Sequence, residues 1–252
     1  MRLFLIRHGE TVAIVTRVLA GSTDTPLTNH GVEQIKRLGE HFDSHGIYFT
    51  HVFSSDLTRA RLTAEGACRG PSGSSPPSPV LTADLRERDF GALEDTPWAA
   101  TSESKSDPSA DEQLPESDAA MNRRANAFLA DRLLPLLLFD GQHETDVVAV
   151  VAHGVILRVL WACLVALFEP DAVHVPRLDD PFKPVWSNTG FLEVKIRQSP
   201  GQTQTTSRVL THWTMDVVEM DSKAHLADLH RTRGGIGSAA FDKRQRRIDQ
   251  FF

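Results

Sequence analysis

The chain has 252 residues, 40% of them hydrophobic and 24% charged, and its formal net charge at pH 7 is -6. This composition is typical of a globular protein with one large core, and the acidic balance argues against a direct nucleic-acid binder. Two cysteines, Cys68 and Cys163, are too few for a disulfide framework, and the most apolar stretch, residues 155–168, is too short to cross a bilayer. We expect an intracellular protein, cytoplasmic or nuclear, with two buried thiols and no membrane partner.

Apolar runs of strand length alternate with segments of helical periodicity along the chain. The pattern predicts strands at residues 2–6, 50–53, 147–152, 192–196 and 209–213. It predicts helices at residues 28–42, 55–68 and 155–168, with Ser55 as an N-cap. Strands that alternate with helices favour an α/β fold, a layered sandwich around a mostly parallel sheet.

Three segments depart from this alternation. Residues 70–79 are all Gly, Pro or Ser, which predicts a loop over about 69–80, and residues 103–118 carry six acidic side chains against one lysine, which predicts a surface insertion over about 99–120. Residues 223–252 carry seven Lys or Arg and three Asp, with glycines at 234, 235 and 237. We therefore expect a domain over residues 1–222 and a basic, flexible tail over residues 223–252.

Two predicted strands each end in a histidine followed by a glycine. Residues 2–6 lead into Arg7, His8 and Gly9, and residues 147–152 lead into His153 and Gly154. The carboxyl ends of parallel strands are where α/β proteins bind ligands, and glycine lets backbone N–H groups approach an anion closely. The helix predicted after residue 152 would direct its positive end to the same place.

The motifs around these histidines resemble, in order, those of the histidine phosphatase (phosphoglycerate mutase-like) superfamily. The matching blocks are residues 5–11 (LIRHGET), 21–31 (GSTDTPLTNHG), 54–60 (SSDLTRA), 85–91 (LRERDFG) and 151–154 (VAHG). A lone Arg-His-Gly is weak evidence, whereas five blocks in the family's order are strong. The resemblance implies a three-layer α/β/α sandwich.

The resemblance also implies the catalytic roles. His8 would be the nucleophile that forms a phosphohistidine, and His153 would assist at the same phosphoryl group. Glu87 would protonate the leaving oxygen and later activate water, which predicts an acidic optimum. Structural alternatives stay open: the two histidines as buried residues at strand ends, and Glu87 as part of a solvated charge cluster.

Phosphate binding is implied for Arg7, Arg59, Gly154 and Thr23, because positioning and charge neutralisation dominate phosphoryl transfer. The arginines would supply the positive charge, so we expect no metal and no cofactor. His41 and His45 have the i, i+4 spacing of half a metal site, but with no third ligand in sight an exposed helix face is favoured. Arg158 is assigned to packing or to a buried ion pair.

One departure from the family pattern concerns residues 12–15 (VAIV), where many members carry an asparagine, so that one polar phosphate contact is absent. The sequence predicts hydrolysis of a small phosphorylated substrate. A phosphoglycerate-type mutase, or a weakly active scaffold, remains as an alternative.

The last eight residues, QRRIDQFF, fit a sliding-clamp (PCNA) interacting peptide. Ile248, Phe251 and Phe252 would lie on one face of a short helix and enter a hydrophobic pocket, with Gln245 at its rim. The alternative is that the tail folds back and buries its phenylalanines against the body.

Overall fold

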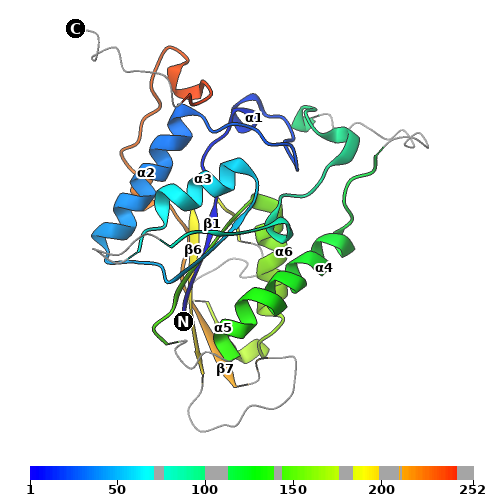
Figure 1. Cartoon of the computed structure of the whole chain (residues 1–252), viewed down its shortest axis with the longest axis vertical. Helices are drawn as coiled ribbons and strands as arrows, with labels where there is room; N and C mark the ends of the chain where they lie inside the picture. Colours follow the sequence, from blue (N-terminus) through cyan, green and yellow to red (C-terminus); the bar gives the residue numbers. More distant parts are fainter. Residues whose placement is uncertain are drawn as a thin grey trace.

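The computed structural model describes residues 1–70, 77–99, 113–138, 144–175, 184–198, 210 and 212–242. Its centre is a seven-stranded sheet in the order β3-β2-β4-β1-β6-β7-β5 (Figure 1). The strands are β1 (Arg2–Arg7), β2 (His51–Ser55), β3 (Val80–Thr82), β4 (Val147–Ala152), β5 (Val173–His174), β6 (Phe191–Gln198) and β7 (Trp213–Ser222).

The sheet is mostly parallel, as the sequence predicts. β1 pairs in parallel with β4, β4 with β2, and β2 with β3, whereas β6 runs antiparallel to β1 and β7. β1 and β4 are continuous apolar runs because both of their faces are covered by helices. Their register places Arg7 opposite Ala152, so His8 and His153 leave the sheet at the same edge.

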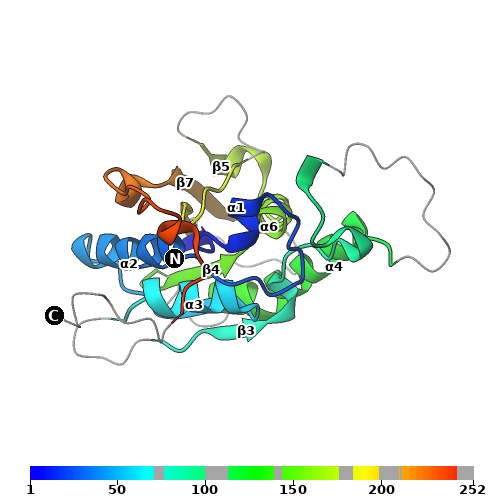
Figure 2. The same ribbon diagram turned by 90° about the horizontal axis from the view of Figure 1, so that it is seen from above.

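Helices cover both faces of the sheet (Figure 2): α2 (Asn29–Ser44) and α3 (Thr58–Ala67) lie on one face, and α4 (Asp118–Phe128), α5 (Leu134–Leu138) and α6 (Gly154–Val165) lie on the other. The short helix α1 (Val12–Thr16) belongs to neither layer and follows β1 at the carboxyl edge of the sheet. Within the described ranges, none of them has the length and apolar character that crossing a bilayer requires.

Alternate residues of the central strands enter two separate cores. Leu3 and Leu5 of β1 pack with side chains of α4 and α6 on one face. Phe4 and Ile6 pack with α2 and α3 on the other, where the rings of Phe4 and Phe42 meet edge-on at 5.6 Å. This two-sided alternation confirms the predicted three-layer α/β/α sandwich.

Several predicted elements have different bounds in the structure. Of the strand predicted at residues 209–213, Trp213 begins β7 and Leu210 forms an isolated bridge with Phe168, whereas residues 209 and 211 lie outside the described residues. The helix predicted from Ser55 begins at Thr58, and Ser55 instead closes β2 with its hydroxyl accepting the N–H of Leu57. Both cysteines are free and buried, as predicted.

The part of the C-terminal segment that the structure describes, residues 223–242, packs against the body, although the sequence predicts a flexible tail there. It lies along α2 in Figure 1. The buried His225 contacts the Thr189 hydroxyl at 3.0 Å, and the N–H of Phe241 donates to the carbonyl of Leu27 at 2.8 Å. Residues 243–252, which include Gln245, Ile248, Phe251 and Phe252, lie outside the described residues.

An ion pair joins this segment to the loop that follows the first histidine. The Arg231 guanidinium binds both carboxylate oxygens of Glu10, with 2.8 Å between Nη1 and Oε1. The Thr28 hydroxyl donates to the same Oε1 at 2.8 Å, and the Glu10 N–H donates to Gln34. Since Glu10 is two residues after His8, the segment helps to fix the conformation of the histidine loop.

Replacing Arg231 with alanine therefore leaves the Glu10 carboxylate, whose side chain is only 9% exposed, without its cation. We expect Arg231→Ala to lower the free energy of unfolding by about 1–3 kcal/mol, measured by urea denaturation. Arg231→Lys should recover only part of the loss because lysine cannot bind in a bidentate manner. The exposed Arg233 is the matched control; equal losses in Arg231→Ala and Arg233→Ala would contradict the assignment.

Candidate active site

The two histidines at the carboxyl edge of the sheet lie side by side. The backbone N–H of His8, directly after β1, donates to the carbonyl of Ala152 at the end of β4. The imidazole rings of His8 and His153 are 4.9 Å apart between centroids. Parallel pairing of β1 and β4 therefore brings together two residues 145 positions apart in the sequence.

His8 is held as a neutral imidazole with one nitrogen directed away from the backbone. Its Nδ1 lies 2.7 Å from the carbonyl of Gly9, so the hydrogen bond assigns the proton to Nδ1 and leaves a lone pair on Nε2. Burial, followed by the charges of Arg59 and Arg7, lowers the pKa of His8 well below its ordinary value. The lone pair therefore stays available at mildly acidic pH.

His153 has the opposite arrangement. Its Nδ1 accepts a hydrogen bond from Nε of Arg59 at 3.2 Å, which assigns the proton to Nε2. This Nε2 is buried and has no hydrogen-bond partner among the described residues. Burial, then Arg59 and His8, lower the pKa of His153 well below the ordinary value, so it is a neutral donor.

Arg59, only 2% exposed, connects His153 to the loop after α1. Its Nη1 donates to the carbonyl of Thr23 at 2.8 Å and its Nη2 to that of Gly21 at 2.7 Å. The Thr23 hydroxyl donates to Glu94 rather than to the pocket, and Thr23 is not among the residues that line it. Thr23 thus contacts the site through its carbonyl.

Arg7 contributes a second, half-buried cation. Its Nη1 donates to the carbonyl of Trp186 at 2.8 Å, while its Nε is buried without a partner in the described part of the chain. Gly154 faces this guanidinium: a Cβ there would lie 3.7 Å from Cζ and Nε of Arg7. Arg7 Nε and His153 Nε2 are therefore two buried donors beside His8 that lack an acceptor, an arrangement suited to an anion.

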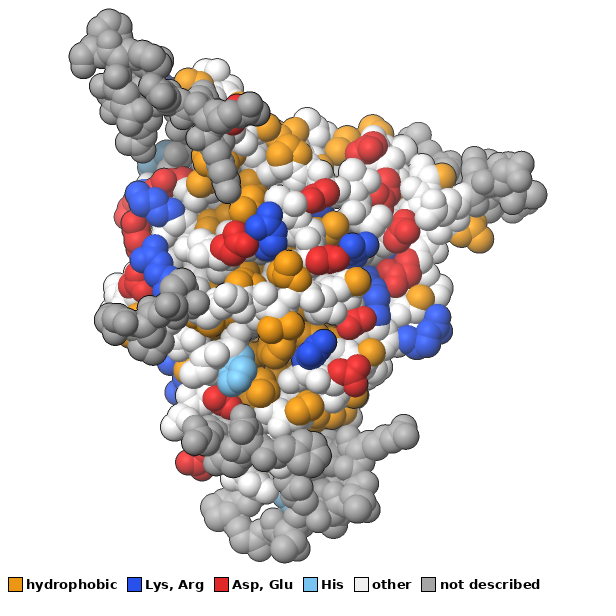
Figure 3. All heavy atoms as spheres, in the orientation of Figure 1, with side chains coloured by type: hydrophobic (Ala, Val, Ile, Leu, Met, Phe, Trp, Pro, Cys, Tyr) orange, Lys and Arg blue, Asp and Glu red, His pale blue; other side chains and the backbone are white. Residues whose placement is uncertain are grey.

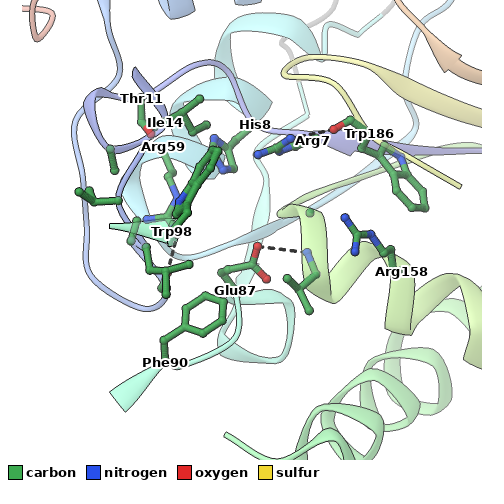
Figure 4. A pocket seen from close by; sticks show the side chains of 17 residues that line it. Arg7, His8, Thr11, Ile14, Arg59, Glu87, Phe90, Trp98, Arg158 and Trp186 are labelled. Carbon is green, nitrogen blue, oxygen red and sulfur yellow. Dashed lines mark hydrogen bonds between the residues drawn. The ribbon is translucent and has the colours of Figure 1, made fainter. Parts of the chain in front are cut away.

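Glu87 lies across the pocket at the start of α6 (Figure 4). One carboxylate oxygen accepts the backbone N–H of Val155 at 3.1 Å, and the other accepts that of Ile156 at 3.2 Å. The first turn of a helix has unpaired N–H groups, and Glu87 occupies two of them. This contact fixes the carboxylate beside Arg7 and Gly154.

A pocket of about 370 Å³ contains most of the predicted site. Of the seven predicted residues, Arg7, His8, Arg59, Glu87 and Gly154 line it, and His153 is in ring contact with His8 without lining the pocket itself. Arg158, assigned from the sequence to packing or an ion pair, is exposed and lines the pocket as well. Its spacing of one helical turn from Gly154 was the available signal, since residues four apart share a helix face.

Sequence reasoning missed the apolar part of the pocket. The side chains concerned come from α1 and the loop after it, from residues around 90–98 and from the segment before β6: Ala13, Ile14, Val18, Leu19, Phe90, Trp98 and Trp186. No motif marks them, because tertiary contacts between distant segments bring them together. Elsewhere in the described ranges, no group of three or more His, Cys, Asp and Glu side chains could hold a metal ion.

Comparison with known proteins agrees with this geometry. Residues 3–178 match the model of the histidine phosphatase superfamily (branch 1). The chain is 40% identical over 94 residues to a broad-specificity phosphatase of Saccharomyces cerevisiae, a match that covers 37% of this chain and 40% of the yeast protein. A protein of Proteus mirabilis named "probable phosphoglycerate mutase" is 33% identical over 181 residues, which cover 66% of this chain and 76% of that one. The match thus spans only about two fifths of the yeast relative.

Solved structures share the fold at lower identity. A structure described as mycobacterial hydrolase 1 has a TM-score of 0.63 at 21% identity and covers 88% of this chain and 99% of its own. The α-ribazole phosphatase of Shigella flexneri has a TM-score of 0.60 at 24% identity, with coverage of 88% and 96%. These likenesses support the three-layer architecture.

Proposed function

The chain belongs to the histidine phosphatase superfamily, and from this premise we propose that it is a metal-independent phosphomonoesterase that works through a phosphohistidine on His8. One observation carries the proposal: the lone pair of a neutral His8 lies beside two buried donors, Arg7 Nε and His153 Nε2, that lack acceptors. A phosphoryl group supplies the acceptors that these donors need and an electrophile for the lone pair.

In the first step, Nε2 of His8 attacks phosphorus and the bond from phosphorus to the ester oxygen breaks. The Arg7 and Arg59 guanidinium groups offset the negative charge on the phosphoryl oxygens, and His153 Nε2–H donates to one of them. Protonated Glu87 gives its proton to the departing oxygen, so an alcohol rather than an alkoxide leaves. Gly154 keeps the space between Arg7 and Glu87 free for the transferred group.

In the second step, water attacks the phosphohistidine and the bond between phosphorus and His8 Nε2 breaks. Glu87, now a carboxylate, accepts a proton from this water, and the products are inorganic phosphate and neutral His8. The cycle therefore restores both residues. Thr23 supports it through the Arg59 contact.

One relative is named a phosphatase and another a probable phosphoglycerate mutase. Transfer of the phosphoryl group to a second hydroxyl is therefore the competing reaction. The two differ only in what accepts the phosphoryl group from His8. Apolar side chains over part of the pocket favour hydrolysis, because a mutase must hold a second polar acceptor in register there.

The purified protein should release phosphate from p-nitrophenyl phosphate in the presence of EDTA, and His8→Ala should abolish the release. Because the lowered pKa of His8 keeps the imidazole neutral, activity should persist from about pH 7 to about pH 5, where an ordinary histidine is mostly protonated. Phosphate release across this range is the measurement, and the exposed His230→Ala is the matched control.

Loss of activity on EDTA addition, or full activity in His8→Ala, would contradict the mechanism. Conversion of 3-phosphoglycerate without phosphate release would establish the mutase.

The role of Glu87 can be distinguished from that of His8 by comparing substrates whose leaving groups differ in their need for a proton. Glu87→Gln should slow hydrolysis of an alkyl phosphate by about 10²–10⁴-fold, since the alkoxide needs a proton. With p-nitrophenyl phosphate, whose leaving group needs none, the same variant should release a burst of p-nitrophenol and accumulate phosphohistidine. Rapid-quench kinetics measures both; equal losses on the two substrates without a burst would argue against Glu87 as proton donor.

A second function, binding of a DNA sliding clamp (PCNA) through Gln245, Ile248, Phe251 and Phe252, rests on the sequence motif alone. Residues 223–242 dock on the body up to the start of this peptide. We expect calorimetry of the full chain with the clamp to give a Kd of tens of micromolar or tighter, and the double variant Phe251→Ala/Phe252→Ala to lose it. Unchanged binding by the double variant, or none by the full chain, would remove this function.

A further inference from the structure

We infer that the substrate is a phosphomonoester of an extended apolar alcohol, which binds against the side chains of Ile14, Val18, Leu19, Phe90 and Trp98. We call these five residues the apolar wall. The inference rests on the proposed phosphatase function and assigns its substrate class.

The wall is built by pairing two segments that are distant in the sequence. After α1 the chain reverses at Arg17, which has φ of 58°, and Val18 then forms a bridge with Pro97. Backbone hydrogen bonds join Leu19 N–H to the Thr96 carbonyl at 2.9 Å and Trp98 N–H to the Arg17 carbonyl at 2.9 Å. This ladder sets Val18 and Leu19 beside Trp98.

Glu94 fixes the wall from its other side. Its carboxylate accepts hydrogen bonds from the backbone N–H groups of Ser22, Thr23 and Phe90. It also accepts hydrogen bonds from the side-chain hydroxyls of Ser22 and Thr23. Burial by itself would raise the pKa of Glu94, but these hydrogen bonds outweigh it and hold the pKa below its ordinary value. A Cβ at Gly21, whose φ is +50°, would collide with this carboxylate, so the position requires glycine. The wall is therefore arranged before substrate binds.

The position of the wall matches the path of the leaving group. In Figure 4, Ile14, Trp98 and Phe90 lie on one side of the pocket, Trp186 and Arg158 on the other, and Glu87 between them. The phosphate end is fixed by the cations at His8, and the ester oxygen must point toward Glu87 to receive a proton. The organic group that continues from this oxygen then lies beside Phe90 and Trp98.

The chemistry of the wall selects against polar alcohols. Ile14, Val18, Leu19 and Phe90 present hydrocarbon only, so a hydroxyl or carboxylate placed on them loses its water without gaining a partner. Trp98 is 45% exposed although its large ring lines the pocket, and it offers apolar area that a bound chain would cover. On the face shown in Figure 3, hydrophobic side chains lie among charged ones of both signs. The wall differs from such a surface because it is concave and adjoins the reacting atoms.

The test compares kcat/KM for ethyl, butyl and hexyl phosphate, whose leaving groups have nearly equal basicity. We expect a rise of about fourfold for each added methylene that contacts the wall. The ratio of hexyl to ethyl phosphate should fall toward one in Trp98→Ala and in Ile14→Asn, and Trp98→Phe should recover most of it. The control is Val218→Ala, an exposed apolar residue of β7 outside the pocket, which should keep the wild-type ratio.

The outcomes separate the two proposals. Equal hydrolysis of the three esters, or a preference for 3-phosphoglycerate over hexyl phosphate, would overturn the apolar substrate class and leave the phosphatase function standing. If wild-type protein hydrolyses none of them, the phosphatase function fails, and calorimetric Kd values for hexyl and ethyl phosphate then decide the inference. Tighter binding of hexyl phosphate that depends on Trp98 would support the wall, and equal Kd values would overturn it.

Discussion

The hydrogen bonds of the buried Arg59 guanidinium connect the two parts of the site, His153 on one side and residues 21–23 on the other. Removing a cation from water is costly, and the structure compensates with three acceptors: the carbonyls of Gly21 and Thr23 and Nδ1 of His153. Burial lowers the pKa of Arg59, while the nearby Glu87 carboxylate acts in the opposite direction. The same contacts set the tautomer of His153 on one side and the conformation of residues 21–23 on the other.

Residues 21–23 connect the buried Arg59 cation to the apolar wall. Residues 22 and 23 are bound to Glu94, and Glu94 also binds the N–H of Phe90. Arg59, which orients the donor that we propose for the phosphoryl group, is thus linked through residues 21–23 and Glu94 to Phe90 of the apolar wall. Two neutral histidines between two arginines leave the pocket short of negative charge, which a phosphate dianion restores. The phosphate end and the apolar organic end that we propose for the substrate therefore depend on one buried network.

The C-terminal segment shows how far local composition misleads. Glycines and basic residues over residues 223–252 predict a flexible tail, yet in its described part the buried His225 contacts Thr189 and Arg231 pairs with Glu10. These contacts join residues more than 30 positions apart, and periodicity carries no information about them.

The sequence by itself determined the core of this fold and the residues of the candidate site. Continuous apolar runs specify β1 and β4 as central strands, and the motifs place His8, Arg59, Glu87 and His153, because short-range pattern and catalytic residue type are local properties. Only the tertiary structure decided which nitrogen of each histidine is hydrogen-bonded, that Thr23 contacts Arg59 through its carbonyl, and that Val18 and Leu19 meet Trp98. These features depend on hydrogen bonds and contacts between segments distant along the chain, and such pairings exist only once the layers have packed.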